Sequence, residues 1–367
     1  MAKIKEQIKN NISLIISNNR NSINIKTTSF VRCKNRIYSQ QVENPKLKLN
    51  KNSYKDSFII SNYIGKVEQK KRGNLQFIYS KSSERVIFDN NLEDTRQQEY
   101  LEASMQIDNR IKTKQFFGKN IIDFFEAIYK NEYIDLFKKE TIKQNELKSF
   151  TEKVNYLLLK GSSTAYIFHE LIGHMLEEDI YSGDSILRHI SFPENIIVEN
   201  ISEPFSQFLG LGSLDDRGDI IKNEVLIKEN EIISEIGKGN YRQEDFFKEP
   251  LPRMKTIKVS SNINENIPFD TNDYLEIQDF IYGSVNPQTG DIKLFATEGY
   301  LSGLFPIKNV RIFGKINNII ENLIIINQNF QFKIATCIKK GQKIPVGLFS
   351  PDSILYTKNL RVLYERK

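Results

Sequence analysis

The chain has 367 residues with 39% hydrophobic content, which is enough to bury a substantial core. This length exceeds that of a typical single domain, so two domains are expected. Lysine and arginine exceed aspartate and glutamate by 52 − 46 = 6, and no zinc-finger, helix-turn-helix or aromatic–basic pattern accompanies this mild excess, so nucleic-acid binding is not expected. Two cysteines argue against a disulfide framework, and no apolar run reaches the roughly 20 residues of a membrane span. Because a signal-peptide core is also missing, we expect a cytoplasmic protein without a membrane partner.

Residues 1–150 are predicted to form an N-terminal α/β domain that ends in a helical connector. Four isoleucines between residues 4 and 15 follow helical spacing. Residues 22–41 and 77–88 are rich in β-branched and aromatic side chains, which favours strands. From about residue 92 to residue 150 the pattern becomes helical and heavily charged. The domain should therefore be a small helix-plus-sheet unit followed by the connector.

Residues 151–367 are predicted to form a mostly antiparallel β domain with one helix near its start. Residues 154–159 are strand-like, and a Gly-Ser-Ser-Thr turn leads into a helix over residues 165–176. Short β-type runs separated by turns follow at 195–198, 219–227, 292–297, 310–313, 323–326 and 354–363. The chain as a whole is expected to be α+β.

Two of the three histidines in the chain flank a glutamate within the predicted helix. His169, Glu170 and His174 lie in the segment His-Glu-Leu-Ile-Gly-His, and the third histidine, His189, lies further along. Neutral imidazoles are good zinc ligands, and an adjacent carboxylate can take a proton from water that the metal has made more acidic. This clustering predicts a zinc site for hydrolysis; the alternative is one surface histidine and one core histidine.

The spacing of these histidines differs from the common metalloprotease pattern, in which they are four residues apart. His169 and His174 are five apart, and on a regular helix this separates their directions by about 140°. Both can reach one ion only if the helix ends, widens or bulges between them. Gly173 would make such a distortion inexpensive, because glycine tolerates unusual backbone angles.

A catalytic zinc usually has three protein ligands, so a third is needed. Cys337 is the natural candidate, because it lies between a strand-like run and a glycine turn, but a small buried thiol that only packs is equally compatible. Glu177, Glu178, Asp179 and Glu298 are rival oxygen ligands.

Several segments match one family in the same order. The histidine segment resembles the HExxxH signature of the TldD/PmbA metallopeptidases. The further segments resemble, in turn, the family's Asp-Asp-x-Gly turn, Gly-Asn-x-Arg loop, Pro-Arg-Met step, Ser-Glu-Ala-Tyr strand and cysteine segment; they are Leu214–Gly218, Gly239–Arg242, Pro252–Met254, Thr297–Tyr300 and Thr336–Gly347. The resemblance covers roughly residues 154–367.

The resemblance implies His169, His174 and Cys337 as zinc ligands and Glu170 as general base. It also implies a homodimer, or a heterodimer with a PmbA-like subunit, in which an unfolded peptide lies as an added β-strand in an enclosed cavity. Silent subunits of the family lack the histidines and the cysteine, whereas this chain keeps them and resembles the active partner. Its N-terminal portion departs from the family by being shorter.

Two arginines within the matching segments could act on substrate. Arg242 and Arg253 could hold a substrate carboxylate or a charged transition-state oxygen, or they could brace the turn at residues 215–216. His189, on an expected strand, and Cys33 are interpreted as structural.

The function predicted from these features is zinc-dependent hydrolysis of peptide bonds in unfolded or flexible peptides, for trimming of leader peptides or peptide turnover. The alternative is a zinc-containing, peptide-binding partner subunit of a TldD/PmbA-like complex without its own turnover. Three protein ligands would leave a position for water and favour the enzyme.

Overall fold

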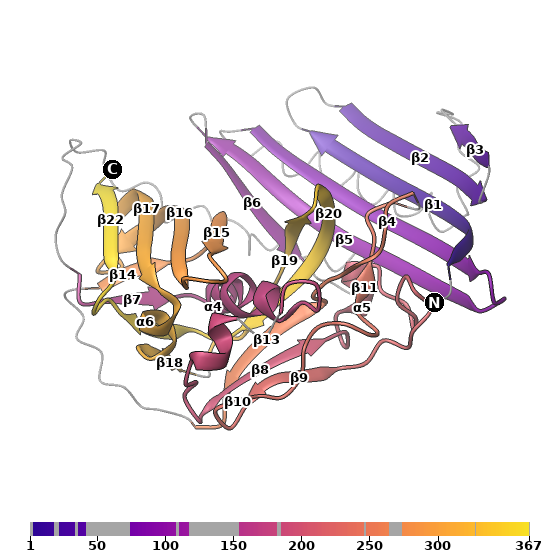
Figure 1. The fold of residues 1–367 in the computed structure, drawn as a ribbon. Coiled ribbons are helices and arrows are strands. Elements are labelled where there is room, and N and C mark those ends of the chain that lie inside the picture. Colours follow the sequence, from indigo (N-terminus) through magenta and orange to yellow (C-terminus); the bar gives the residue numbers. More distant parts are fainter. Residues whose placement is uncertain are drawn as a thin grey trace. The chain divides into compact units, whose positions relative to one another are not determined.

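The structure is a computed structural model, and it describes residues 3–17, 22–33, 36–41, 74–107, 110–116, 154–181, 185–245, 247–263, 274–326 and 328–366. Contacts divide the chain into two compact units (Figure 1). We call them the N-terminal unit (Ala2–Lys143 with Ser206–Ser213) and the C-terminal unit (Gln144–Phe205 with Leu214–Lys367). Among the described residues, no helix is both long enough and apolar enough to span a membrane.

The N-terminal unit contains a six-stranded antiparallel sheet in the order β3-β2-β1-β4-β5-β6. Its strands are β1 (Ile4–Ser17), β2 (Ser22–Cys33), β3 (Arg36–Gln41), β4 (Asn74–Phe88), β5 (Glu93–Ile107) and β6 (Arg110–Phe116). The short helix α5 (Ser206–Leu209) contacts β5, where Gln98 donates a hydrogen bond of 3.2 Å to the backbone oxygen of Phe208.

The strands predicted at residues 22–41 and 77–88 are confirmed, but two helical predictions in this unit are wrong. Residues 4–15 lie in β1, which pairs with β2 and β4. The four-residue intervals from Ile4 to Ile8 and Ile12 did not separate the two alternatives, because such an interval returns to the same face of a strand as well as of a helix. Residues 93–107 and 110–116 form β5 and β6 instead of the expected helical connector, although glutamate, glutamine and alanine in β5 favour helices. Pairing of β5 with β4 and of β6 with β5 outweighs intrinsic propensity. The rest of the expected connector, from residue 117 to residue 150, lies outside the described residues.

The C-terminal unit is built on two large sheets, and most of their strand pairs are antiparallel, as predicted for this part of the chain. One has the order β18-β21-β7-β14-β16-β17-β22, with β15 on β16, and the other β10-β9-β8-β13-β20-β19. Their strands are β7 (Tyr156–Leu159), β8 (Ile196–Ile201), β9 (Glu224–Lys228), β10 (Glu231–Ile232), β13 (Thr256–Ser261), β14 (Tyr274–Ile277), β15 (Tyr282–Val285), β16 (Asp291–Leu301), β17 (Phe305–Lys315), β18 (Leu323–Ile325), β19 (Gln331–Lys339), β20 (Gln342–Ser350), β21 (Ser353–Tyr356) and β22 (Arg361–Arg366).

Smaller elements complete this unit. Strands β11 (Tyr241–Arg242) and β12 (Leu251–Pro252) form a two-stranded sheet, and helix α6 (Ile316–Ile320) follows β17. Each predicted β run overlaps a strand, although residues 219–223 precede β9 and the run at 354–363 is divided between β21 and β22. His189 is exposed at the end of a 3-10 turn (Ile186–His189), so its predicted strand is wrong.

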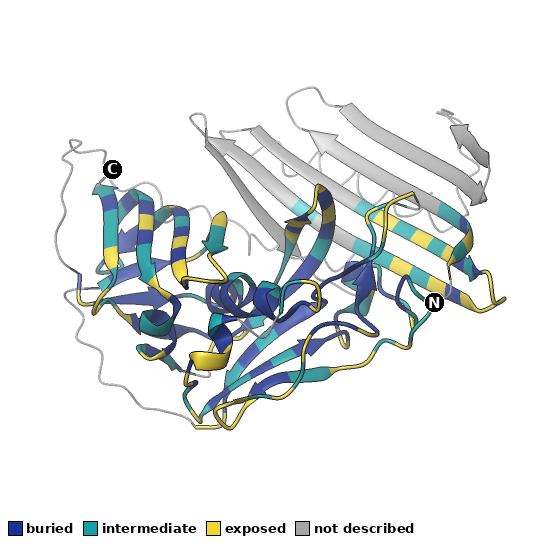
Figure 2. Cartoon of the chain, viewed as in Figure 1, coloured by how far each residue is buried: buried dark blue, intermediate teal, exposed yellow. Residues whose placement is uncertain are grey.

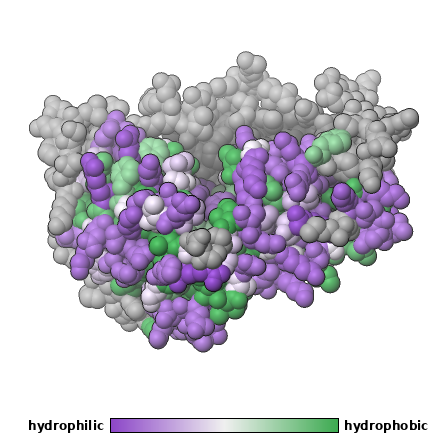
Figure 3. All heavy atoms as spheres, viewed as in Figure 1, coloured by the Kyte–Doolittle hydropathy of each residue, from purple (hydrophilic) through white to green (hydrophobic). Residues whose placement is uncertain are grey.

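The predicted helix at residues 165–176 is present but changes type along its length. Helix α4 (Ser162–Phe168) is followed by a π-helical turn (His169–Gly173) and a 3-10 turn (His174–Leu176). This helical segment lies between the two sheets, because α4 contacts β13 and β20 and the π-helical turn contacts β15. Figure 2 shows α4 and the strands beside it as mostly buried, whereas hydrophilic side chains dominate the described part of the face in Figure 3.

The beginning of α4 is buried, and groups far along the chain satisfy its backbone. The amide of Gly161 donates to Asp352 at 2.7 Å, and the amide of Ala165 donates to the hydroxyl of Ser350 at 2.8 Å. Buried N–H groups need such partners, because an unpaired amide in the core is destabilising. The loop between β20 and β21 therefore holds the helix that carries both histidines.

Candidate metal centre

The π-helical turn brings His169 and His174 to the same side of the helical segment. The backbone N–H of His174 donates to the carbonyl oxygen of His169, an i→i+5 bond that adds one residue to the turn. As a result the two imidazole centroids are 4.8 Å apart, and the rings are inclined at 73°. The widening of the helix that the five-residue spacing predicted is confirmed.

Gly173 is required for a different reason from the predicted one. Its backbone angles, φ −56° and ψ −54°, are ordinary helical values that any residue can adopt. A Cβ at this position, however, would lie 1.9 Å from Sδ of Met254, which is fully buried. The glycine therefore makes room for a neighbouring side chain and does not supply backbone freedom.

Cys337 reaches the histidines from β19. Its sulfur lies 3.3 Å from Nε2 of His174, and one ligand atom from each of His169, His174 and Cys337 lies within 4.8 Å of the others. In a tetrahedral zinc site, bonds of about 2.3 Å to sulfur and 2.0 Å to nitrogen place these two atoms about 3.5 Å apart. The three side chains could together hold a metal ion.

Further observations agree with a metal at this position. His169 is 3% exposed, and its Nδ1 has no hydrogen-bond partner among the described residues. A buried ring nitrogen without a partner is unfavourable, and coordination of a cation by this ring would stabilise it. Two imidazoles and one thiol are also the donor types that zinc prefers. The residues present therefore fit a zinc ion.

Three of the rival acidic residues are engaged elsewhere. Oε2 of Glu177 lies 3.1 Å from Nδ1 of His174. Glu178 accepts a 2.6 Å hydrogen bond from the hydroxyl of Tyr241. Asp179 pairs with two lysines, Lys339 and Lys340. The fourth rival, Glu298, lies on β16 opposite Lys308 and does not belong to the three-residue group.

The electrostatics of the two histidines differ. Burial, together with the charges of His174 and Arg253, lowers the pKa of His169 well below its usual value. Burial also disfavours charge on His174, but hydrogen bonds with Cys337 and Glu177 outweigh it and raise the pKa of His174 to about 10. Without metal, the positively charged form of the His174 ring is therefore favoured.

Glu170 lies beside the three-residue group in a half-buried position. Burial raises the pKa of its carboxyl, while the charge of His174 and a hydrogen bond from the hydroxyl of Tyr166 oppose the rise. The ring of Tyr166 stacks on Phe280 with centroids 5.8 Å apart. A Cβ at Gly283, on β15, would lie 2.5 Å from Cγ of Glu170. Glycine there lets the strand approach the carboxylate closely.

Sequence reasoning missed Tyr166 and Gly283 as neighbours of this carboxylate. The four-residue interval between Tyr166 and Glu170 on one helical face was an available signal, since such residues contact each other. No local pattern could have found Gly283, because β15 meets the helical segment only through the fold.

The two arginines contact backbone oxygens close to Cys337. Arg253 is fully buried and donates from Nη2 to the carbonyl oxygen of Cys337 at 2.7 Å. Arg242 donates to the carbonyl oxygens of Pro345 at 2.7 Å and Met254 at 3.2 Å. These bonds hold the strands around the cysteine; a contact with substrate stays a prediction. The side chain of Cys33, on β2, lies outside the described residues.

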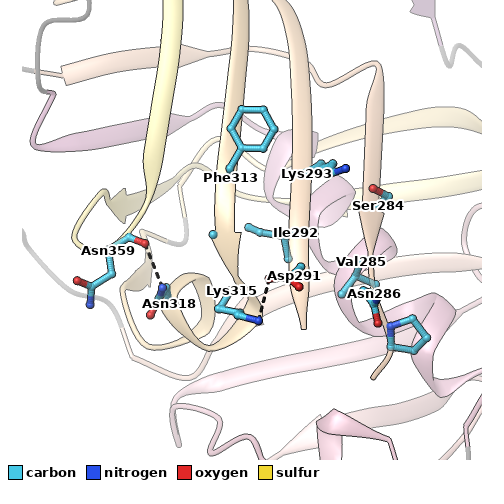
Figure 4. Close-up of a pocket in the computed structure, with 12 residues that line it drawn as sticks. Ser284, Val285, Asn286, Asp291, Ile292, Lys293, Phe313, Lys315, Asn318 and Asn359 are labelled. Carbon is cyan, nitrogen blue, oxygen red and sulfur yellow. Dashed lines mark hydrogen bonds and ion pairs between the residues drawn. The ribbon is translucent and has the colours of Figure 1, made fainter. Parts of the chain in front are cut away.

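A separate hollow of about 780 Å³ lies where β15, β16 and β17 meet α6 (Figure 4). Lys315 forms an ion pair of 2.8 Å with Asp291 in this hollow, and the side chain of Asn318 donates to the backbone oxygen of Asn359 at 3.1 Å. Its lining contains none of the residues of the candidate metal centre, so the hollow is a distinct surface feature.

Comparisons with known proteins identify the fold. No protein-family model and no curated protein sequence matches the chain. Among solved structures, TldE from Thermococcus kodakarensis matches with a TM-score of 0.60 at 9% identity, over 99% of this chain and 96% of TldE. A Thermotoga maritima protein described as a candidate modulator of a DNA gyrase matches with a TM-score of 0.58 at 11% identity, over 99% and 95% of the two chains.

A third match is a candidate modulator of DNA gyrase from Bacteroides thetaiotaomicron, with a TM-score of 0.56 at 10% identity, over 97% of this chain and 94% of the other. At such identities the likeness is one of fold, so the chain has an α+β fold of the TldE type. The TldD/PmbA resemblance that the motifs predicted is thereby confirmed for the fold.

Proposed function

We propose that the chain is a zinc-dependent peptidase of the TldD/PmbA family that cleaves unfolded or flexible peptides. The observation that carries this proposal is the π-helical turn, which directs His169 and His174 toward the thiol of Cys337. Glu170, the residue directly after the first histidine, lies beside this group. The fold shared with TldE supports the same class.

The side chains divide the chemistry between them. A zinc ion held by His169, His174 and Cys337 would polarise a peptide carbonyl and make a nearby water more acidic. Glu170 accepts a proton from the water as the water oxygen bonds to the carbonyl carbon of the peptide. It then passes that proton to the amine nitrogen as the carbon–nitrogen bond breaks. The burial that raises the pKa of Glu170 makes it a stronger base at neutral pH.

The position of β15 supports an extended peptide as substrate. Among the described strands, β15 pairs only with β16, and Gly283 of β15 packs against Glu170. A peptide lying along this strand edge would be held by backbone hydrogen bonds, which are independent of side-chain identity. Loose sequence specificity follows, and it suits trimming of leader peptides or peptide turnover in the cytoplasm. A homodimer, or a heterodimer with a PmbA-like subunit, is part of the same proposal.

Metal content and peptide cleavage test the proposal together. We expect about one zinc per chain by elemental mass spectrometry, and loss of that zinc in the His169→Ala, His174→Ala variant. Cleavage of an unfolded peptide should stop on chelation and return with added zinc. Bound zinc without any cleavage would favour the partner subunit without turnover, and a chain that binds no zinc would exclude the proposed mechanism.

A further inference from the structure

Strand β19 presents two side chains to the same buried side. Cys337 and Lys339 are 3% and 8% exposed, whereas Ile338 between them is 61% exposed, as the alternation of a strand requires. Cys337 contacts Nε2 of His174 at 3.3 Å. Lys339 contacts Oε2 of Glu177 at 2.8 Å, and the same oxygen lies 3.1 Å from Nδ1 of His174. Side chains of one strand therefore lie on both sides of one imidazole: Cys337 directly at Nε2, and Lys339 through Glu177 at Nδ1.

Glu177 is suited to orient the ring of His174. It follows His174 by three residues, its backbone N–H donates to the carbonyl oxygen of His174, and its side chain is fully buried. A carboxylate that accepts the proton of Nδ1 leaves the lone pair of Nε2 available for a metal. Oε2 makes both contacts, while Oε1 has no partner among the described residues, so Lys339 selects the orientation of the carboxylate.

Lys339 is itself held in one place. It pairs with Asp179 as well as with Glu177, and it donates to the carbonyl oxygen of Pro252 at 3.3 Å. Burial of an ammonium group is costly unless its partners surround it, so these contacts fix the position of its nitrogen. Lys340, the next residue, also pairs with Asp179 at 3.0 Å, but its side chain is 63% exposed.

We propose that Lys339 is a positioning residue of the metal centre, which acts through Glu177 to hold the His174 ring with Nε2 directed at Cys337 and the metal. This role rests on the proposed zinc site. It adds two residues, Lys339 and Glu177, that touch neither the metal nor the substrate but set the geometry of a ligand.

The test compares neighbouring lysines in the full-length protein. Lys339→Met and Lys340→Met remove the same charge from adjacent residues, but only the first loses the contact with Glu177. Dissociation constants for zinc and Co(II) are measured by competition with a chelator. We expect Lys339→Met to weaken binding about 10–100-fold and Lys340→Met to change it by less than about twofold. The cobalt d–d absorption should change in Lys339→Met, while the sulfur-to-cobalt charge-transfer band persists because Cys337 remains.

A double-mutant cycle separates positioning from a general structural role. If Lys339 acts through Glu177, the Glu177→Gln, Lys339→Met variant should bind zinc no more weakly than Glu177→Gln alone. Additive losses would contradict the proposal, as would unchanged zinc affinity in Lys339→Met. Should Lys339→Met fail to fold, Glu177→Gln decides, because it keeps the shape of the side chain, and unchanged affinity there would overturn the role.

Failure of this role can be told apart from failure of the proposed function. A wild-type chain that binds zinc, together with a Lys339→Met variant that binds it equally well, removes the positioning role and leaves the zinc site intact. A wild-type chain that binds neither zinc nor Co(II) removes both.

Discussion

The candidate metal centre has two walls that are built in different ways. The helical wall, residues 162–176, carries both histidines and Glu170, and a single backbone bond between His169 and His174 sets their spacing. The strand wall, β19, carries Cys337 and Lys339, which share a side through strand alternation. Local backbone geometry organises the first wall, whereas the second meets it only through tertiary structure.

This difference predicts which substitutions affect catalysis without affecting metal binding, and which affect metal binding directly. A change on the helical wall can remove the base without loss of the ion, because Glu170 lies outside the three-residue ligand group. A change at Cys337 on the strand wall would remove a proposed ligand and leave the proposed base in place. Three substitutions test the comparison, and the largest expected effect comes first.

Glu170→Gln should abolish most of the peptidase activity while zinc content stays at the wild-type level. A carboxamide cannot accept the proton, and loss of a general base typically lowers the rate by about 10²–10⁴-fold. Peptide cleavage assays and elemental mass spectrometry of the same preparation measure both properties. Glu178→Gln, at an exposed residue eight positions further on, is the matched control and should remain active. Comparable activity in Glu170→Gln and wild type would rule out this base.

Cys337→Ser should weaken zinc binding by about 10–100-fold or more, because a direct ligand should matter at least as much as a supporting residue. A chelator-competition titration measures this change, and the sulfur-to-cobalt charge-transfer band should disappear in the Co(II) form. Cys33→Ser is the control, since it alters the other cysteine of the chain. Zinc binding at wild-type strength in Cys337→Ser would mean that another residue completes the site.

Gly173→Ala should lower the free energy of unfolding by about 1–3 kcal/mol, because the added methyl group overpacks the contact with Met254. Urea denaturation of the metal-free protein measures the change. In a Met254→Ala background the same substitution should become neutral or stabilising, since alanine favours helical backbone over glycine by about 1 kcal/mol. An equal cost in both backgrounds would instead indicate that the turn needs the backbone freedom of glycine.

The sequence predicted the helical wall well and the strand wall only in part. His169, Glu170 and His174 are close in the chain, so their spacing was enough to predict a widened helix, even though the reason assigned to Gly173 was wrong. Cys337 lies 163 residues from His174. Its place between a strand-like run and a glycine turn made it a candidate, but the family resemblance was needed to favour it over a merely packed thiol or the rival acidic residues.

The errors in the N-terminal unit have a related physical cause. The isoleucine pattern at residues 4–15 and the helix-favouring composition of residues 93–107 are local signals, whereas both segments are strands through pairing with distant partners. The role of Lys339 could not be predicted from local sequence for the same reason, because its contacts with Glu177 and Asp179 span 162 and 160 residues.

The buried beginning of α4 also has a consequence for the order of folding. Its amides at Gly161 and Ala165 bond to side chains 191 and 185 residues further along the chain. Such long-range contacts are slow to form, and during synthesis they must wait until the last part of the chain has emerged. The two histidines are therefore synthesised early, but Cys337 can join them only after β19 has paired with β20 in its sheet.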